Sequence, residues 1–177
     1  GEKVKGAEQR KKENEKYCDL LKIENIKEIK TENFRKQKRV KFKRLTPVYP
    51  DERIKLETGK TPLSLRMIDM IAPIGKGQRS LIVSPPKAGK TTLLKNIATG
   101  VAKNSPDIHL MAVLVGERPE EVTDIRRHMA DITDGDAEVA ASNFDESAED
   151  QCRVAELALN RAKRMVEMGE DVMILLD

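Results

Sequence analysis

The segment Ser84–Thr92, which reads SPPKAGKTT, constrains the fold of this 177-residue chain more than any other part of the sequence. An apolar run precedes it, and apolar residues at helical spacing follow it. The sequence therefore predicts a strand over 80–83, a turn, and a helix over 91–103. A strand that leads through a glycine-containing turn into a helix is typical of phosphate-binding loops.

The match to the phosphate-loop pattern G-x-x-x-x-G-K-[ST] is incomplete, because Ser84 stands where the first glycine belongs. Gly89, Lys90 and Thr91 supply the rest of the pattern. Backbone N–H groups and the positive end of the helix would hold the phosphates, Lys90 would reach the β- and γ-phosphates, and the Thr91 hydroxyl would bind Mg²⁺. The alternative is a Gly-Lys-Thr turn that binds nothing, but the flanking strand and helix favour a nucleotide site.

The rest of the chain after residue 64 alternates between strand and helix patterns. Apolar runs at 110–115, 139–142 and 172–176 predict strands, the first of them buried on both faces. Pro119 suits the first residue of a helix, and Ser147 suits the cap of the next one. The sequence therefore predicts an α/β fold with a parallel sheet.

Two carboxylates follow strands and are candidates for the chemistry of nucleotide hydrolysis. Asp177 ends the 172–176 run, where a Mg²⁺ ligand is expected; a polar residue that merely leaves a strand is the alternative. Glu117 follows the 110–115 run, and we predict that it activates the attacking water. Arg118 would orient it or contact phosphate, although an ordinary salt bridge in a loop also explains this pair.

Charge is distributed unevenly along the chain. Residues 1–60 carry 19 Lys and Arg against 11 Asp and Glu, whereas the remainder carries 14 against 19. The run 34–44 has seven basic residues and no acid, which fits either a solvated linker or a contact with nucleic acid. No apolar run is long enough to span a membrane, no secretory signal is present, and the two cysteines are far apart. These features predict a cytoplasmic protein that does not bind membranes.

Taken together, several segments resemble the bacterial transcription termination factor Rho family. The segments are Leu45–Pro50 (LTPVYP), Ile71–Gln78 (IAPIGKGQ), Ser84–Thr91 (SPPKAGKT) and Gly116–Thr123 (GERPEEVT). The last two are much narrower than a general phosphate loop, and loops of the Rho type also lack the first glycine. The resemblance implies a RecA-like P-loop ATPase core that is truncated at both ends and preceded by the remnant of an OB or cold-shock-like domain.

The resemblance also implies a set of site residues. Glu117 and Lys90 are expected to be catalytic, and Thr91 and Asp177 to hold Mg²⁺. The remaining nucleotide-binding residues implied by the family pattern are Gly75, Lys76, Gly77, Gln78, Arg79, Ser80, Lys87, Ala88, Gly89, Thr92 and Arg118. ATP and Mg²⁺ are the expected cofactors.

The family pattern divides the chain into three parts. Residues 1–30 correspond to the end of the RNA-binding OB domain, in which Glu15 and Tyr17 would line a base pocket. Residues 31–62 form a charged basic linker, and residues 63–177 form the first part of the ATPase domain.

The implied function is that of an RNA-dependent ATPase and helicase that forms a hexameric ring. Its partners would be single-stranded nascent RNA and the RNA polymerase complex, and residues 1–177 alone are expected to be inactive. One alternative is a rotary or secretion-type ATPase subunit of the RecA-like superfamily, which would not depend on RNA. Another is a nucleotide-binding interaction module without turnover.

Overall fold

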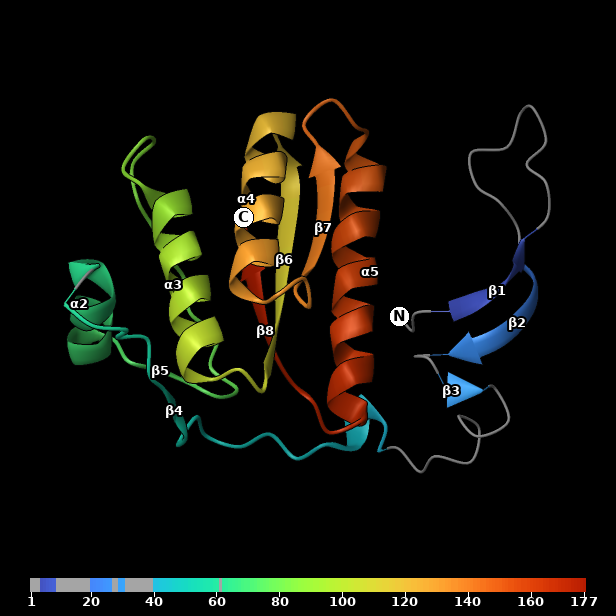
Figure 1. Cartoon of the computed structure of the whole chain (residues 1–177), viewed down its shortest axis with the longest axis horizontal. Helices are drawn as coiled ribbons and strands as arrows, with labels where there is room; N and C mark the ends of the chain where they lie inside the picture. The colour runs from blue at the N-terminus through green and yellow to red at the C-terminus, as the bar shows by residue number, and fades with distance from the viewer. Residues whose placement is uncertain (1–3, 9–19, 27–28, 31–39, 61) are drawn as a thin grey trace.

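The computed structural model describes residues 4–8, 20–26, 29–30, 40–60 and 62–177. Their elements, in chain order, are β1 (Val4–Glu8), β2 (Leu20–Ile26), β3 (Ile29–Lys30), η1 (Phe42–Arg44), β4 (Arg53–Ile54), α2 (Leu63–Ile71), β5 (Ile74–Gly75), α3 (Lys90–Asn104), β6 (Ile108–Glu117), α4 (Pro119–Ile132), β7 (Glu138–Asn143), α5 (Ala148–Glu167) and β8 (Asp171–Leu176) (Figure 1). None of the described helices is long and apolar enough to cross a membrane.

The centre of the fold is a parallel sheet in the order β7-β6-β8. Helices α3 and α4 cover one face of this sheet, and α5 covers the other (Figure 1). This three-layer arrangement confirms the predicted α/β fold with a parallel sheet. Because the strands are parallel, their carboxyl ends meet at one edge, where open sheets of this kind bind ligands.

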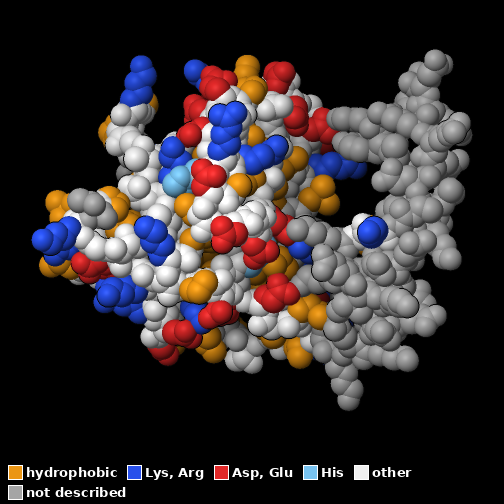
Figure 2. All heavy atoms as spheres, viewed as in Figure 1, with side chains coloured by type: hydrophobic (Ala, Val, Ile, Leu, Met, Phe, Trp, Pro, Cys, Tyr) orange, Lys and Arg blue, Asp and Glu red, His pale blue; other side chains and the backbone are white. Residues whose placement is uncertain are grey.

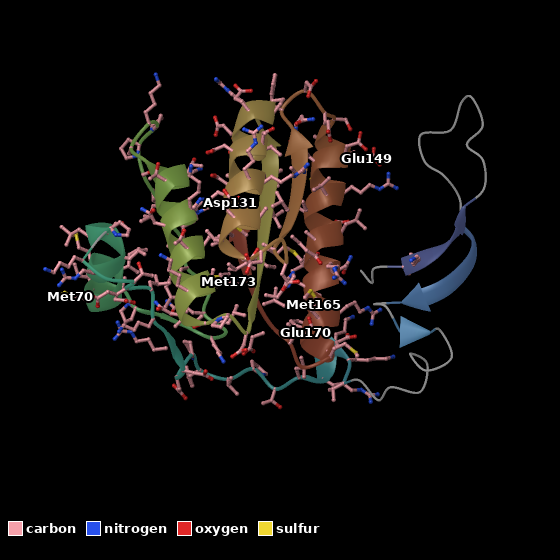
Figure 3. All side chains as sticks on the ribbon, viewed as in Figure 1. Met70, Asp131, Glu149, Met165, Glu170 and Met173 are labelled. Carbon is pink, nitrogen blue, oxygen red and sulfur yellow. The ribbon has the colours of Figure 1, made fainter. Side chains whose placement is uncertain are left out.

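The middle strand, β6, supplies both halves of the core through the two-residue alternation of a strand. Met111 and Val113 pack toward α5 with Ala158, Ala162 and Met165, the last of which is labelled in Figure 3. The alternate residues of β6 belong to the larger cluster beneath α3 and α4: Leu110, Ala112 and Leu114. Burial on both faces explains why residues 110–115 of this strand are apolar without interruption.

The predicted helix starts are confirmed. Pro119 is the first residue of α4, where its missing N–H costs nothing. Ser147 caps α5, since its Oγ accepts a hydrogen bond of 3.2 Å from the backbone N–H of Asp150. The phosphate-loop helix spans 90–104, one residue longer at each end than predicted.

The strand predicted over 80–83 is not formed as a paired strand. Its side chains do alternate, since Ile82 packs against the core whereas Leu81 and Val83 are 86% and 82% exposed. The sequence therefore predicted the alternation of buried and exposed side chains correctly. The prediction of a strand was wrong, because the backbone of this segment is not paired with another strand. Within the described part of the chain, β8 is an edge strand and does not pair with this segment.

Residues 40–60, called the strap below, run along the amino-terminal edge of the sheet from η1 to α2 (Figure 1). The buried carboxylate of Asp69 in α2 fixes this segment by accepting hydrogen bonds from the backbone of Leu56 (3.1 Å) and Glu57 (2.8 Å). The Asn104 amide donates to the carbonyls of Lys55 (2.9 Å) and Glu57 (3.0 Å). These bonds satisfy backbone groups that a chain without regular structure would otherwise leave unpaired.

Elsewhere, β1, β2 and β3 form a separate antiparallel sheet in that order. Glu15 and Tyr17, predicted to line a base pocket, lie outside the described residues. The assignment of 1–30 to an OB domain, of 31–62 to a linker and of 63–177 to an ATPase domain stays a prediction. The surface of the described part mixes acidic and basic side chains, and apolar ones gather over α2, where Met70 is 82% exposed (Figure 2).

Candidate nucleotide site

The carboxyl edge of the sheet brings Asp177 and Lys90 into contact. Asp177 extends the ladder of β8, donating its N–H to the Val113 carbonyl (3.0 Å) and accepting from the Val115 N–H (2.8 Å) at its own carbonyl. Lys90, the first residue of α3, forms an ion pair with the Asp177 carboxylate. This contact raises the pKa of the Lys90 ammonium, so the cation is firmly protonated.

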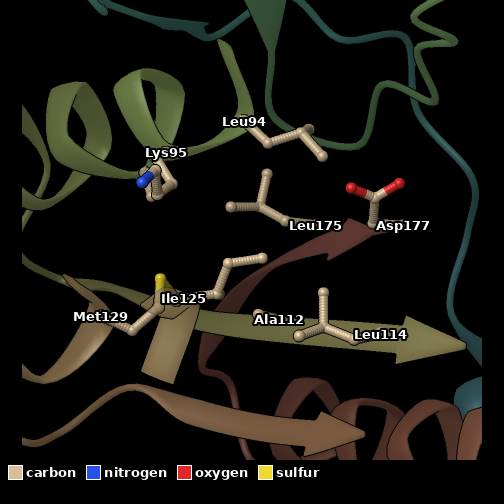
Figure 4. Close-up of a pocket in the computed structure, with 9 residues that line it drawn as sticks. Leu94, Lys95, Ala112, Leu114, Ile125, Met129, Leu175 and Asp177 are labelled. Atoms are coloured by element: carbon tan, nitrogen blue, oxygen red, sulfur yellow. The ribbon is translucent and has the colours of Figure 1, made fainter. Parts of the chain in front are cut away.

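The Asp177 side chain is only 2% exposed, and its surroundings are mostly apolar. Asp177 is one of the residues that line a small pocket, together with Leu94, Leu114 and Leu175 (Figure 4). Its buried Oδ1 accepts no well-aligned hydrogen bond and depends on the charge of Lys90. A carboxylate in such a place requires a cation, because a buried unpaired charge is costly.

The loop that precedes α3 has the backbone form that an anion site requires. Gly89 is left-handed (φ 92°), and its carbonyl accepts the N–H of Leu93 in the first turn of the helix. No side chain caps α3 in the described structure, so the N–H groups of its first turn are available to a phosphate.

The loop also explains why the first glycine of the pattern is dispensable. Among the described non-glycine residues, only Lys87 (φ 62°) and Asp134 (φ 50°) have positive φ. Ser84 is not one of them, so a side chain is tolerated there. The strained residue within the loop is Lys87, and such strain is common at ligand sites.

Glu117 is brought to the same edge by a β-bulge. The pairing of β6 with β7 is regular up to Val115 and Ser142, and then Gly116 is left over before Glu117 pairs with Asn143. Gly116 has a φ of 70°, which disfavours other residues, and its N–H donates to the Ser142 Oγ at 3.1 Å. The bulge re-aims the end of the strand and hence the Glu117 side chain.

The electrostatic surroundings of Glu117 favour its protonated form. Burial raises the pKa of its carboxyl above the ordinary value, and the negative charges of Asp177 and Glu121 raise it further. Lys90 acts in the opposite direction but does not cancel these effects. A carboxylate with a raised pKa is suited to accept a proton from water.

The other residues of the phosphate loop lie in its turn and at the start of α3. Ala88 and Lys87 belong to its exposed turn, Thr91 and Thr92 follow Lys90 in the first turn of α3, and Thr91 is half-buried. Arg118 is exposed and directly precedes α4.

The Gly75–Ser80 turn begins at the opposite edge of the sheet from Asp177. Its Lys76 ammonium pairs with Asp171 (2.8 Å), the first residue of β8, and with Glu52 of the strap (2.6 Å). These two carboxylates raise the pKa of Lys76. Gly75 and Gln78 close the turn on each other, since the Gln78 side chain accepts the Gly75 N–H at 2.9 Å. The structure therefore does not bring the Lys76 side chain to Lys90, and the chain from Gly77 through Arg79 and Ser80 connects the turn to the loop.

Sequence reasoning missed the residues that support this site. Ser142 is 1% exposed and holds the bulge, and Gln151 of α5 lies beside Gly116, where an added Cβ would be 3.4 Å from its Oε1. A serine at the end of an otherwise apolar strand is a signal that could have identified Ser142. Gln151 has no comparable signal, because its role depends on the packing of α5.

The donor set suits a hard divalent cation bound together with a nucleotide. A carboxylate and a hydroxyl, from Asp177 and Thr91, are oxygen ligands of the kind that Mg²⁺ prefers. The described residues contain no group of three or more His, Cys, Asp or Glu that could hold a metal alone. Mg²⁺ typically takes its remaining ligands from phosphates and water, so this sparse set fits such an ion.

Comparison with known proteins assigns this site to a class. Residues 64–177 match the model of the ATP synthase alpha/beta family, nucleotide-binding domain. A solved ATP synthase subunit, NeqB from Nanoarcheaum equitans, superposes with a TM-score of 0.62 over 77% of this chain and 32% of its own, at 23% identity. The chain belongs to the ATP synthase alpha/beta family and contains its nucleotide-binding domain.

Within that class, the chain is similar to curated transcription termination factors Rho. The chain is 50% identical to Rho of Mycobacterium tuberculosis over 100% of its length and 29% of the relative's. It is 49% identical to Rho of Bacillus subtilis, again over its whole length and 40% of the relative's. The resemblance to Rho that the motifs predicted is thereby confirmed, and the chain spans less than half of the length of these relatives.

Proposed function

We propose that this chain provides the nucleotide site of an ATP-hydrolysing, RNA-dependent helicase or translocase that acts in transcription termination. The observation that carries the proposal is the meeting of Lys90, Asp177 and Glu117 at one edge of the sheet. The identity to Rho factors along the whole chain supports the cellular role.

In this proposal, the ion pair between Lys90 and Asp177 belongs to the nucleotide-free state. Lys90 is 45% exposed and has a flexible side chain, so it can turn from the carboxylate to an arriving phosphate. The Asp177 carboxylate is then free for Mg²⁺, together with the Thr91 hydroxyl. Mg²⁺ would neutralise charge on the β- and γ-phosphates. A cation thus lies beside the buried carboxylate in both states.

Glu117 would orient a water molecule and accept its proton as the water attacks the γ-phosphate. The Val115 N–H donates to the Asp177 carbonyl, and this is the last bond between the two strands. Glu117 follows this bond in β6, after the bulge at Gly116. Arg118 would contact the nucleotide or stabilise the Glu117 carboxylate. The turn 75–80, including Lys76, is counted in the nucleotide site of the family pattern, and that role rests on the resemblance alone.

The proposed partners are single-stranded nascent RNA, the transcription complex and further copies of the same chain in a ring. Support for them comes from the Rho relatives, which are transcription termination factors. A rotary or secretion-type ATPase of the same family would hydrolyse ATP without RNA, and an interaction module would bind nucleotide without turnover.

The test is ATP hydrolysis by the full-length protein with and without C-rich RNA. We expect RNA to stimulate turnover and Glu117→Gln to lower it by roughly 10²–10⁴-fold, the usual contribution of a general base. Binding of a fluorescent ATP analogue should survive in this variant and be lost in Lys90→Met. Glu120→Gln, in the exposed first turn of α4, is the matched control and should keep full activity.

Each alternative has its own outcome in this assay. Turnover that is independent of RNA would favour the rotary or secretion class, and binding without any turnover would favour the interaction module. Intact RNA-stimulated hydrolysis in Glu117→Gln would show that the water is activated by another residue.

A further inference from the structure

The beginning of the strap carries a concentration of positive charge that the nucleotide site does not use. Lys41, Lys43 and Arg44 lie in or beside η1 and are all exposed. The structure records no ion pair for any of them within the described residues. From Val40 to Pro50 the chain contains no acidic residue.

Helix α5 adds a fourth cation to this surface. η1 lies at the carboxyl-terminal end of α5 (Figure 1), and the Lys163 ammonium lies 5.8 Å from the centre of the Phe42 ring. This cation–π contact holds the ring in place. The basic patch is defined here as Lys41, Lys43, Arg44 and Lys163.

Among the described residues, Glu167 provides the carboxylate that is bonded to η1, and it does not pair with a cation of the basic patch. Glu167 accepts a 2.8 Å hydrogen bond from the Phe42 N–H and pairs with Arg164 at 2.7 Å. Its side chain is 8% exposed, so its charge faces inward. The Glu167 carboxylate therefore fixes η1 on α5, while Lys41, Lys43 and Arg44 remain exposed and Lys163 lies half-buried beside them.

Aromatic side chains accompany these charges. Phe42 is 42% exposed even with Lys163 over its ring, and Tyr49, which lies between Pro47 and Pro50, is 86% exposed. Tyr49 is seven positions after Phe42, which corresponds to at most about 25 Å of extended backbone. Cations that follow a phosphate backbone and rings on which bases stack are the two components of single-strand binding.

We propose that the basic patch, together with Phe42 and Tyr49, binds single-stranded RNA at the carboxyl-terminal end of α5. The proposal rests on the proposed RNA dependence, which it extends by naming a contact surface distinct from the nucleotide site. RNA fits better than an acidic protein segment, because exposed rings beside unpaired cations match bases beside phosphates. RNA bound here would lie on the first part of the strap, which continues from η1 through β4 toward α2.

The experiment measures binding of the full-length protein to a fluorescent oligouridine of about 12 nucleotides, a length within the usual range of single-strand site sizes. Replacing Lys41, Lys43 and Arg44 with Gln should weaken binding about tenfold or more and lower the slope of log affinity against log salt by about 2, since each single-strand phosphate contact contributes about 0.7. Tyr49→Ala should weaken binding at least fivefold with an unchanged slope, because it removes stacking but no charge.

The matched control replaces three other exposed cations, Lys55, Lys103 and Arg126, with Gln and should leave affinity and slope unchanged. Photo-cross-linking with 5-iodouridine RNA should label the peptide that contains Tyr49. The inference is overturned if the patch variant binds like the wild type, if no cross-link maps to Val40–Tyr49, or if a polyglutamate peptide competes as well as RNA. Binding of a fluorescent ATP analogue is measured separately in the same proteins. If the wild type does not bind the analogue, the proposed nucleotide site is contradicted, but the proposed RNA contact of the basic patch is not.

Discussion

Glu117 shows how much one side chain depends on its neighbours in this site. It lies beyond a bulge, beside the negative charges of Asp177 and Glu121, in partly buried surroundings. Burial and the charges of Asp177 and Glu121 all favour the protonated form of Glu117, whereas the charge of Lys90 opposes them. The folded state therefore holds a proton on Glu117 more tightly than the unfolded chain does.

This difference makes a pH-dependent contribution to stability that Glu117→Gln removes. An unfolded glutamate has a pKa of about 4.3, and the folded value is higher. The wild type therefore loses stability as the pH rises from below about 4.3 through the folded pKa, and the loss is constant above it. The free energy of unfolding of Glu117→Gln relative to the wild type should rise over that window, as measured by urea unfolding at a series of pH values.

Asp124 provides a control of opposite sign. Its ion pair with Lys95 (2.8 Å) lowers the pKa of the Asp124 carboxyl, so its contribution is present at neutral pH and lost as the pH falls. Asp124→Asn should lose stability relative to the wild type as the pH rises. A flat profile for Glu117→Gln beside a sloping one for Asp124→Asn would contradict the assigned surroundings of Glu117.

At the scale of elements, α3 meets the strap at Gly100. A Cβ at this position would lie 2.6 Å from the carbonyl oxygen of Leu56, a residue with no exposed surface. Only glycine permits this approach of helix and strap, although glycine is a poor helix former. The close contact fixes α3, and hence the position of Lys90 at its other end.

Gly100→Ala should therefore destabilise the protein by roughly 1–3 kcal/mol, the usual cost of overpacking a core, despite the gain of about 1 kcal/mol in helix propensity. Thermal or urea unfolding measures this. Lys103→Ala, on the exposed surface of the same helix, should change stability by less than about 0.5 kcal/mol. An unchanged or higher stability of Gly100→Ala would mean that the strap does not hold α3 in this way.

The elements that were predictable from the sequence are those whose pattern reflects their own surroundings. The runs at 110–115, 139–142 and 172–176 became β6, β7 and β8 with one or two extra residues at most ends, because burial on the sheet dictates apolar residues. The segment 80–83 kept its alternation but lacks a ladder, since backbone pairing depends on a neighbour that a local pattern does not report.

The site was predictable to the same degree. Lys90, Glu117 and Asp177 lie at one edge because each follows or precedes an element whose direction the parallel fold determines. The placement of Lys76 between Glu52 and Asp171 was not accessible, because it depends on where the strap crosses the sheet. Long-range contacts of an irregular segment leave no periodic signal in the sequence.

At the scale of the whole molecule, ligand binding and folding should be linked through the ion pair of Lys90 and Asp177. ATP with Mg²⁺ at 100 times its dissociation constant should raise the free energy of unfolding by about 2.7 kcal/mol. Lys90→Met should abolish this gain, and Asp177→Asn should make what remains insensitive to the removal of Mg²⁺ by a chelator. Unfolding curves with ATP alone, ATP with Mg²⁺ and ATP with chelator give the measurement; identical curves in all three would contradict the proposed site.

The ladder that joins Asp177 to Val113 and Val115 has a consequence for motion. Glu117 belongs to β6, the same strand as Val113 and Val115. The backbones of Glu117 and Asp177 therefore belong to one cooperative unit, which opens only when the sheet itself opens. The phosphate loop contributes no strand to that unit, so we expect it to move without opening the sheet, on the shorter timescale that is usual for loops. In the proposed site, we therefore expect nucleotide entry and release to depend on the motion of Ser84–Gly89, while the backbone positions of Glu117 and Asp177 stay fixed relative to each other.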